Sequence, residues 1–351
     1  MKLICHLMYL DKFIPPYIKF IEENLDPSQH IFLIYGDDPQ LAMFPTPKRD
    51  NVVLLWQRFP SVLSRDLYVC WKIARAYKIF IHGLWEHRLN RLLCFVFWKL
   101  KDCHYAIWGA DLYHYIEGDK SSPWYNKKEK YRRFIIKRFG FFIPVVYEEY
   151  DLAVEWYGAT GKMLEPFMYV HFYEPYQNLP LKPQGEIINI QVGNSATQSN
   201  HHKEAFHLLA KHPIEKLRIY TPISYGDEDY AREVKQLGEE LFGENFKPLE
   251  SYMPFKEYEA FLQSIDIAIF NQWEQQAMGN IFVLIALGKK VYINAGASHY
   301  EFLKQKGFRI FDLASFSLDP ISKEDALHNK NLVLELYSKE KQIANQKSFF
   351  A

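Results

Sequence analysis

The stretch "FNQWEQQAMGNIFVLIALGKKVYIN", residues 270–294, joins the end of one predicted strand to a helix and then to a second strand. Its apolar run Ile281–Leu287 is typical of a buried helix, and Gly288 ends it. The residues Lys290–Asn294 that follow read as a strand. A strand, a helix and a strand in this order predict a βαβ unit, whose two strands lie parallel in one sheet.

The same alternation extends over most of the chain. Short apolar runs, several of which end at or just before glycine, alternate with amphipathic stretches such as residues 14–24 and 64–77. A second series of strand-like runs begins after residue 185, with helices predicted over residues 229–241 and 255–264. We therefore expect an α/β protein with two Rossmann-like, doubly wound domains that face each other across a cleft.

Residues 171–186 break both series and contain Pro175, Pro180 and Pro183, which is typical of a connection between domains. The predicted organisation has four parts. It consists of an N-terminal domain over residues 1–172, a linker over 173–186, a C-terminal domain over 187–320, and a helical segment over 321–351 that could pack back on the N-terminal domain.

The composition bounds the class of protein. The chain has 351 residues, of which 48% are hydrophobic and 24% charged, as in a globular protein. Lysine and arginine together number 42, as do aspartate and glutamate, so net charge gives no indication of a nucleic-acid partner. Four cysteines without a CxxC pair favour a reducing compartment, and no apolar run is long enough to predict a transmembrane helix.

Two stretches of the second half could bind a phosphate, since ligands of parallel sheets bind beyond the carboxyl ends of the strands. In "QVGNSATQSNHH", residues 191–202, a strand is followed by Gly193, Asn194 and Ser195 and then by a helix that starts near Ser199 or Asn200. Free N–H groups at such a helix start favour a phosphate. The stretch is neither a Walker loop nor GxGxxG, and an ordinary capped loop is the alternative.

The second stretch places polar residues at the start of the apolar helix described above. Their amide side chains could bind sugar hydroxyls while backbone N–H groups hold a diphosphate, although a capped buried helix would have the same pattern. Tyr252, in "LESYMP" after another predicted strand, is a candidate to stack on or border a nucleotide base. The polar residues are Gln275, Gln276, Gly279 and Asn280.

No metal signature is present in the sequence. The 13 histidines include no HExxH, and the chain has no Asp-x-Asp motif of the kind that Mg²⁺-dependent sugar transferases use. A GxSxG elbow is also absent, which disfavours a serine hydrolase. We therefore predict no metal ligands.

Taken together, four blocks resemble the TDP-N-acetylfucosamine:lipid II N-acetylfucosaminyltransferases, a family also labelled 4-alpha-L-fucosyltransferase. Their order and spacing match from about residue 80 to 305, whereas the first 75 residues match only in strand pattern. The blocks are "WGADLY" (108–113), "VGNS" followed by "SNHH" (192–202), "LGEELFGENFKPLESYMPFKEYEAFL" (237–262) and "QQAMG" (275–279).

This resemblance implies a metal-independent GT-B glycosyltransferase whose C-terminal domain holds a TDP- or UDP-linked sugar. The N-terminal domain would hold a polyprenyl-diphosphate-linked glycan, at the cytoplasmic face of a bacterial plasma membrane, for surface polysaccharide synthesis. The family has Gly-Asp-Arg where this chain has 196–198, and Gly-Ile-Gly-Thr where it has 277–280, so the sugar and base can differ from the family's fucose-type deoxyamino donor. A non-catalytic nucleotide-sugar or glycan-binding protein and an epimerase on the same shell are alternatives.

Asp111, in "HYAIWGADLYHY" (104–115), follows a predicted strand and lies beside Trp108, Leu112 and Tyr113. A carboxylate in such apolar surroundings costs free energy unless it is paired or used. It could take the proton of the acceptor hydroxyl, since burial raises a carboxyl pKa toward that task, or it could cap the helix from Leu112 onward. His82, in "FIHGLW", is the second candidate base, and a structural role is its alternative.

The stretch Lys120–Arg138 is rich in basic and aromatic residues and has Glu129 as its acidic residue within the predicted helix. A helix of this composition is typical of an interfacial anchor on anionic lipid. The alternative is a solvated helix face whose apolar side packs into the N-terminal domain. The basic residues are Lys120, Lys127, Lys128, Lys130, Arg132, Arg133, Lys137 and Arg138.

Overall fold

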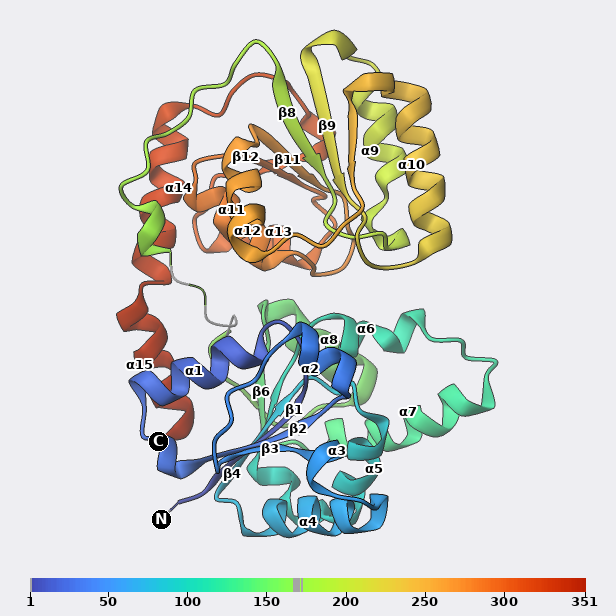
Figure 1. The fold of residues 1–351 in the computed structure, drawn as a ribbon, viewed down its shortest axis with the longest axis vertical. Helices are drawn as coiled ribbons and strands as arrows, with labels where there is room; N and C mark the ends of the chain where they lie inside the picture. The colour runs from blue at the N-terminus through green and yellow to red at the C-terminus, as the bar shows by residue number, and fades with distance from the viewer. Residues whose placement is uncertain (1, 167–170, 172) are drawn as a thin grey trace. The chain divides into compact units, whose positions relative to one another are not determined.

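The computed structural model describes residues 2–166, 171 and 173–351. The chain forms two compact units, each with its own parallel sheet and covering helices (Figure 1). Unit 1 comprises Met1–His171 and Glu340–Ala351, and unit 2 comprises Phe172–Lys339. The α/β class predicted from the sequence is confirmed, and each unit is Rossmann-like.

The sheet of unit 1 has seven parallel strands in the order β3-β2-β1-β4-β5-β6-β7. Its strands are almost entirely buried because helices cover both faces, as parallel sheets require. The order reverses between β1 and β4, which defines the switch point where such sheets bind ligands. The strands are β1 (Ile4–Tyr9), β2 (His30–Tyr35), β3 (Val52–Leu54), β4 (Lys78–His82), β5 (Cys103–Ala106), β6 (Phe141–Ile143) and β7 (Lys162–Met163).

The helices of unit 1 follow the predicted alternation. Helix α4 begins two residues before the predicted range 64–77 because Ser61 caps it, with its Oγ accepting from the Ser64 N–H at 3.2 Å. The elements are α1 (Ile14–Asn24), η1 (Pro27–Gln29), α2 (Asp38–Met43), α3 (Leu55–Arg58), α4 (Val62–Arg75), α5 (His87–Phe95), η2 (Phe97–Asp102), α6 (Ala110–Glu117), α7 (Pro123–Ile136), α8 (Tyr147–Tyr157) and, at the other end of the chain, α15 (Lys339–Phe350).

The sheet of unit 2 has six parallel strands in the order β10-β9-β8-β11-β12-β13, so its switch point lies between β8 and β11. Strands β11 and β12 pair in parallel on either side of α12, which confirms the βαβ unit predicted from residues 270–294. The strands are β8 (Ile188–Val192), β9 (Leu217–Pro222), β10 (Phe246–Leu249), β11 (Ile267–Phe270), β12 (Lys290–Ile293) and β13 (Phe311–Asp312).

Helix α12 begins at Met278, three residues before the predicted run Ile281–Leu287. The helical elements of unit 2 are η3 (Glu174–Tyr176), η4 (Gln198–Asn200), α9 (His202–Leu209), η5 (Ile214–Lys216), α10 (Glu228–Phe242), η6 (Gly243–Asn245), α11 (Phe255–Ser264), α12 (Met278–Ala286), α13 (Ser298–Gln305), η7 (Leu313–Ser315) and α14 (Lys323–Leu336).

The segment after residue 320 is divided between the units. Helix α14 packs on α12 and belongs to unit 2, whereas α15 belongs to unit 1 from Glu340 onward. Within unit 1, the Tyr17 hydroxyl donates to Gln346 Oε1 at 3.0 Å and Lys78 Nζ donates to the Phe349 carbonyl at 2.9 Å. The last turn of the chain therefore forms part of the core of unit 1.

This arrangement predicts that unit 1 depends on α15 for stability. The Phe349 side chain is buried, and we expect Phe349→Ala to lower the free energy of unfolding by about 3 kcal/mol, as for other large-to-small core substitutions. Lys347→Ala, on the exposed side of the same helix, is the matched control and should be nearly neutral. Urea unfolding of both variants measures the difference, and equal midpoints would contradict the assignment of α15 to the core.

Candidate active site

The loop after β8 contains the first predicted donor residues, and its backbone requires glycine at one position. Gly193 has φ +69°, in the left-handed region. A Cβ there would lie 2.4 Å from His202 Nε2 and 2.9 Å from Asn200 Oδ1, too close for any other residue without rearrangement. The turn therefore lies tightly against the start of α9, at the switch point of the sheet.

Asn200 holds this loop in place. Its side chain is fully buried, and its Oδ1 accepts from the Asn194 N–H at 3.0 Å. Its Nδ2 donates to Ser195 Oγ at 3.2 Å and reaches Gln276 Oε1 at 3.4 Å. One buried amide thus joins the loop after β8 to the residues before α12.

Two further amides complete this network. Gln272 Nε2 donates to Asn194 Oδ1 at 2.9 Å, and Gln276 Nε2 donates to Ser199 Oγ at 2.9 Å. The fold therefore brings together four of the predicted donor residues, Gly193, Asn194, Ser195 and Gln276. It adds Asn200 and Gln272, which lie inside the quoted stretches but were not selected there as ligands.

The backbone is strained beside the amide network. Within residues 2–166, 171 and 173–351, the non-glycine residues with positive φ are His201 (48°) and Ala277 (57°). They are the N-cap residues of α9 and α12, the two helices that start beside the amide network. Such backbone costs about 1–3 kcal/mol per residue and clusters at ligand sites.

The start of α12 leaves its first N–H groups without intrahelical partners, and no side chain caps it. A Cβ added to Gly279 would meet nothing within 4 Å, so there is open space beside this residue of the first turn. Gln275 is buried, and its Oε1, like Gln272 Oε1, has no hydrogen-bond partner among the residues that the structure describes. The two amide oxygens can accept hydrogen bonds from the hydroxyls of a ligand, and the N–H groups of α12 can donate to an anionic group.

The remaining predicted donor residues are less engaged. Asn280 is half-buried in the first turn of α12. Tyr252 is 61% exposed in the loop between β10 and α11, where a planar ligand could reach its ring. No hydrogen bond of the described residues joins Tyr252 to the amide network, and its contact with a base stays a prediction.

Asp111 lies inside unit 1, with 2% of its surface exposed. Its Oδ2 accepts from the Leu84 N–H at 2.8 Å and from the Tyr105 hydroxyl at 2.6 Å, and its Oδ1 accepts from the Trp108 N–H at 2.9 Å. Burial raises the pKa of the carboxyl, and these three donors oppose that shift. The predicted cap is wrong, because α6 starts after Gly109 and has no side-chain cap.

Arg132 occupies the interior beside Asp111. The guanidinium donates to the carbonyls of Leu84, at 3.3 Å, and of Asp111, and it pairs with Glu129 Oε2 at 3.3 Å. It therefore joins the loops after β4 and β5 to α7. Of the eight basic residues of 120–138, Arg132 is 3% exposed and its charge is used in the core, so it is not among those that could contact a membrane.

His82 is buried as well, at the end of β4. Its Nε2 lies 3.0 Å from His6 Nδ1, and His6 Nε2 lies 2.9 Å from His30 Nδ1, so three imidazoles on adjacent strands form one chain. Burial lowers the pKa of His82 to about 3 and that of His30 to about 4. This environment favours the structural reading of His82, and its service as a base stays a prediction.

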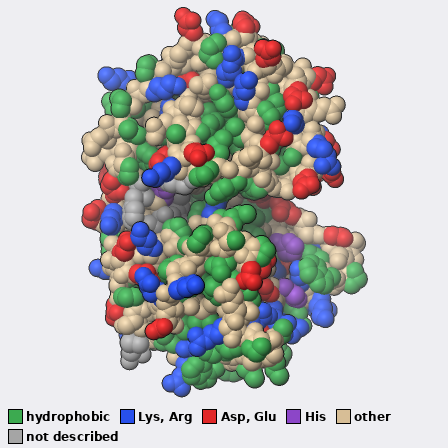
Figure 2. All heavy atoms as spheres, in the orientation of Figure 1, with side chains coloured by type: hydrophobic (Ala, Val, Ile, Leu, Met, Phe, Trp, Pro, Cys, Tyr) green, Lys and Arg blue, Asp and Glu red, His purple; other side chains and the backbone are tan. Residues whose placement is uncertain are grey.

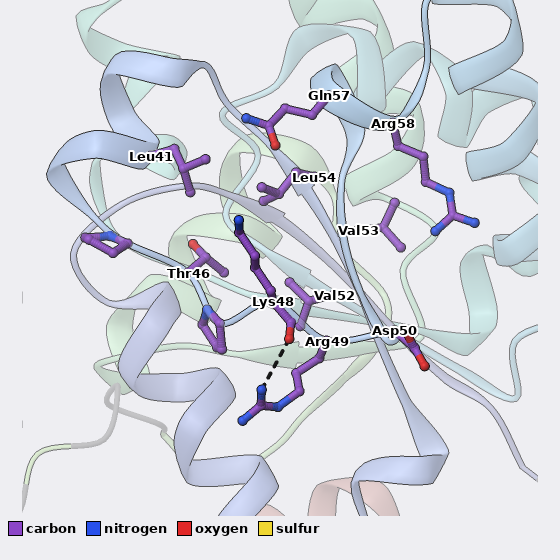
Figure 3. Close-up of a pocket in the computed structure, with 12 residues that line it drawn as sticks. Leu41, Thr46, Lys48, Arg49, Asp50, Val52, Val53, Leu54, Gln57 and Arg58 are labelled. Carbon is purple, nitrogen blue, oxygen red and sulfur yellow. Dashed lines mark hydrogen bonds between the residues drawn. The ribbon is translucent and has the colours of Figure 1, made fainter.

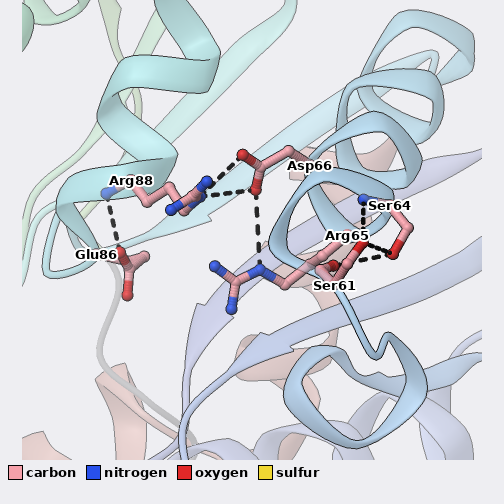
Figure 4. A network of polar contacts seen from close by, with 6 residues as sticks. All are labelled: Ser61, Ser64, Arg65, Asp66, Glu86 and Arg88. Carbon is pink, nitrogen blue, oxygen red and sulfur yellow. Dashed lines mark hydrogen bonds and ion pairs between the residues drawn. The ribbon is translucent and has the colours of Figure 1, made fainter.

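Figure 4 shows a polar network at the starts of α4 and α5, which both lie at the carboxyl edge of the sheet in unit 1. Arg88 Nε donates to both oxygens of Asp66 at 2.8 and 2.9 Å. Arg65 makes only a long contact to Asp66, at 3.8 Å, and its buried Nε has no hydrogen-bond partner among the described residues. Its guanidinium also faces the ring of Tyr35, 5.7 Å away at the end of β2. Arg65 is thus a cation with unused hydrogen-bond donors at the carboxyl edge of the sheet, which is the edge where doubly wound sheets bind ligands.

A surface hollow of about 610 Å³ lies at the edge strand β3, lined by residues of α2, α3 and the connection between them (Figure 3). Lys48, Arg49 and Arg58 contribute cations to its wall, and Arg49 also pairs with Glu22 at 3.5 Å. None of the predicted site residues lines this hollow. Among the described residues, no group of three or more His, Cys, Asp or Glu is placed to hold a metal ion.

The fold matches solved structures of glycosyltransferases over nearly its whole length. A glycosyltransferase of Rickettsia africae aligns with TM-score 0.66 and 12% identity, covering 99% of this chain and 98% of that one. Sucrose-phosphate synthase of Thermosynechococcus elongatus aligns with TM-score 0.64 and 12% identity over 99% and 98%. Anabaena HepE in complex with UDP and glucose aligns with TM-score 0.61 and 12% identity over 98% and 92%.

These similarities define the fold as GT-B, the two-domain fold of many glycosyltransferases. Residues 52–339 match the family model of the 4-alpha-L-fucosyltransferases, glycosyl transferase group 56, and the chain belongs to this family. The match confirms the resemblance inferred from the sequence and begins nearer the N-terminus than the colinear motifs do. Membership of this family identifies the protein as a glycosyltransferase, in preference to a binding protein or an epimerase of the same fold.

The geometry predicts that Asp111 acts mainly as an anchor for two loops. Asp111→Asn places an amide N–H against a backbone donor, and we expect a loss of about 1–3 kcal/mol in the free energy of unfolding, as for other buried unpaired groups. Tyr105→Phe, which removes one donor and keeps the carboxylate, should cost less. Thermal unfolding measures both.

Turnover of the folded Asp111→Asn protein tests the alternative role. A general base would cost about 10²-fold or more in turnover with donor affinity unchanged. Near-normal turnover well below the unfolding transition excludes Asp111 as the base, whereas a large loss in a protein of unchanged stability contradicts the anchor assignment.

Proposed function

We propose that this enzyme transfers a fucose-type deoxyamino sugar from a TDP- or UDP-linked donor to a polyprenyl-diphosphate-linked glycan, in the synthesis of a bacterial surface polysaccharide. The observation that supports the donor half is the buried amide network of Asn194, Asn200, Gln272 and Gln276. It lies at the switch point of unit 2, where doubly wound sheets bind nucleotides. Membership of the fucosyltransferase family supports the type of sugar.

The donor diphosphate would lie between the Gly193–Ser195 turn and the start of α12. The first N–H groups of α12 point to this space, and its dipole favours negative charge there. The unpartnered amide oxygens of Gln272 and Gln275 would accept from sugar hydroxyls or from the amide of a deoxyamino sugar. As the glycosidic bond to the diphosphate breaks, the same N–H groups would stabilise the leaving charge, which is the basis for proposing a metal-independent reaction.

The acceptor would bind to unit 1. A polyprenyl diphosphate carries negative charge, and Arg65 offers a guanidinium with unused donors at the carboxyl edge of that sheet. The helix starts of α4 and α5 lie in the same network and favour an anion as well. Because such an acceptor cannot leave the bilayer, we propose peripheral attachment at the inner face of the plasma membrane; none of the helices in the described part of the chain is long and apolar enough to span it.

We expect donor binding to depend on the amide network and to survive chelation. Gln276→Ala removes three hydrogen bonds of a half-buried side chain, to Asn200, Ser199 and Glu274, and should weaken TDP or UDP binding about tenfold or more. Gln305→Ala, an exposed glutamine of α13 in the same unit, is the control. Calorimetric titration with each nucleotide, with and without excess EDTA, measures the effect, and loss of binding on chelation would overturn the metal-free mechanism.

For the acceptor, we expect Arg65→Gln to raise KM for a short-chain prenyl-diphosphate glycan about tenfold, because one charge-assisted contact to phosphate is lost. Donor affinity and the unfolding temperature should change little, since the contact of Arg65 to Asp66 is long. Arg232→Gln, on the exposed side of α10, is the control. Steady-state kinetics with each substrate varied separately tests this, and an unchanged acceptor KM would place the diphosphate elsewhere.

A further inference from the structure

Helix α4 differs from an ordinary surface helix because it exposes large apolar side chains and buries an acid. Its buried residues are Asp66, Val69 and Ile73, so one of the three is an acid, which Arg88 neutralises. Its solvent side carries Leu63, Leu67 and Trp71, which are 68%, 63% and 49% exposed. The spacing of four residues places these three side chains in one row along the helix.

The last residue of α5 and the 3₁₀ helix η2 add further exposed aromatic side chains. Phe95, Phe97 and Trp98 are each more than half exposed, and Phe97 and Trp98 lie edge to face at 5.6 Å. Lys99 Nζ donates to the Ala76 carbonyl at 2.8 Å, which holds η2 against the end of α4. We call the six side chains together the α4 surface: Leu63, Leu67, Trp71, Phe95, Phe97 and Trp98. A soluble monomer rarely exposes so many large apolar groups together unless they bind something.

The charges around the α4 surface are basic. Lys72 and Arg75 lie against the ring of Trp71, at 4.8 and 5.4 Å from its centroid, and Lys101 is exposed on η2. The acids of these two helices are both neutralised, Asp66 by Arg88 and Asp102 by Lys99. Figure 2 shows hydrophobic side chains beside lysine and arginine at the end of unit 1 where Figure 1 draws α4.

We propose that the α4 surface docks unit 1 on an anionic lipid bilayer, with the aromatic and leucine side chains inserted at the headgroup level and the cations on lipid phosphates. Tryptophan and phenylalanine on one side, basic residues at the rim and no free acid are the features of interfacial membrane helices. The charge pattern favours lipid over a second copy of the chain, because the cations of two identical surfaces would repel. That this contact gives access to a lipid-linked acceptor rests on the proposed function. That the α4 surface binds a bilayer rests only on its exposed aromatic and basic side chains.

This surface replaces α7 as the membrane contact. In α7 the residues Arg132 and Glu129 are buried, and the apolar residues Ile135 and Ile136 pack into the core. The exposed cations of α7 therefore have Trp124, which is 60% exposed, as the large apolar side chain beside them, compared with six such side chains on the α4 surface. Basic residues alone give a weak, salt-sensitive attachment, whereas inserted aromatics resist salt.

Sedimentation of the full-length protein with vesicles of equal parts phosphatidylcholine and phosphatidylglycerol tests the proposal. We expect Leu67→Glu/Trp71→Glu to lower vesicle binding about tenfold or more at both low and high salt. The control Val154→Glu/Leu327→Glu changes exposed aliphatic residues of α8 and α14 and should bind like the wild type. Lys72→Gln/Arg75→Gln/Lys101→Gln should lose mainly the salt-dependent part of binding.

Four outcomes decide between the proposals. Equal sedimentation of the wild type and Leu67→Glu/Trp71→Glu overturns the proposal, as does a dimer in analytical ultracentrifugation that this variant abolishes without any vesicle binding. Loss of vesicle binding with UDP or TDP binding and the unfolding temperature intact supports it. Vesicle binding by a wild type that transfers no sugar to a prenyl-diphosphate acceptor would refute the proposed function and leave the docking surface standing.

Discussion

A buried guanidinium, that of Arg132, is the constraint on which unit 1 is built. Burying Arg132 costs several kcal/mol unless it is paired: it donates to the carbonyls of Leu84 and Asp111 and to the Tyr157 hydroxyl, and Glu129 supplies the opposite charge at 3.3 Å. The Asp111 carboxylate in turn accepts from the backbone N–H groups of Leu84 and Trp108, in the same two loops, and from the Tyr105 hydroxyl of β5. The loops after β4 and β5 can therefore shift only if charges lose partners. The ligand edge of this unit is fixed by electrostatics rather than by packing alone.

Unit 2 fixes its loops mainly with neutral groups. Asparagine and glutamine side chains, each of which both donates and accepts, hold the loop after β8 and the residues before α12. The buried carboxylate of Glu274 joins this network by accepting from the Gln276 side chain. The N-cap residues His201 and Ala277 have left-handed backbone, which is strained. The starts of α9 and α12 are therefore held beside the amide network at a cost in free energy.

How much of this the sequence could reveal depended on the range of the interactions involved. The βαβ unit around α12, the Gly193 turn and the polar start of α12 were predictable because periodicity and turn chemistry are local. Asn200 and Gln272 were not, because their importance arises from partners about 70 residues apart in the chain. Asp111 was singled out correctly as a costly carboxylate, but its partner Leu84 lies 27 residues away and could not be named.

The orientation of helix α4 could not be predicted from the sequence pattern, for a different reason. Apolar residues at helical spacing indicate which residues share a face, but not which face is inside, and here an aspartate lies inside because Arg88 reaches it from α5. In the stretch 120–138 the orientation of Arg132 was also not predictable, since a count of charges does not show that this side chain is buried. The family resemblance supplied the fold and the class of reaction, and it contains no information about either orientation.

The three imidazoles of His82, His6 and His30 have a consequence of their own. Their lowered pKa values keep them neutral over the physiological range, and a neutral imidazole carries a single ring proton. In a chain with two N···N contacts, His6 can donate to only one neighbour, so the other neighbour must donate to it. All three rings therefore share one direction of donation, and no ring can change tautomer unless the others change with it. Strands β2, β1 and β4 are thereby linked by a single two-state proton arrangement that crosses the sheet perpendicular to its backbone.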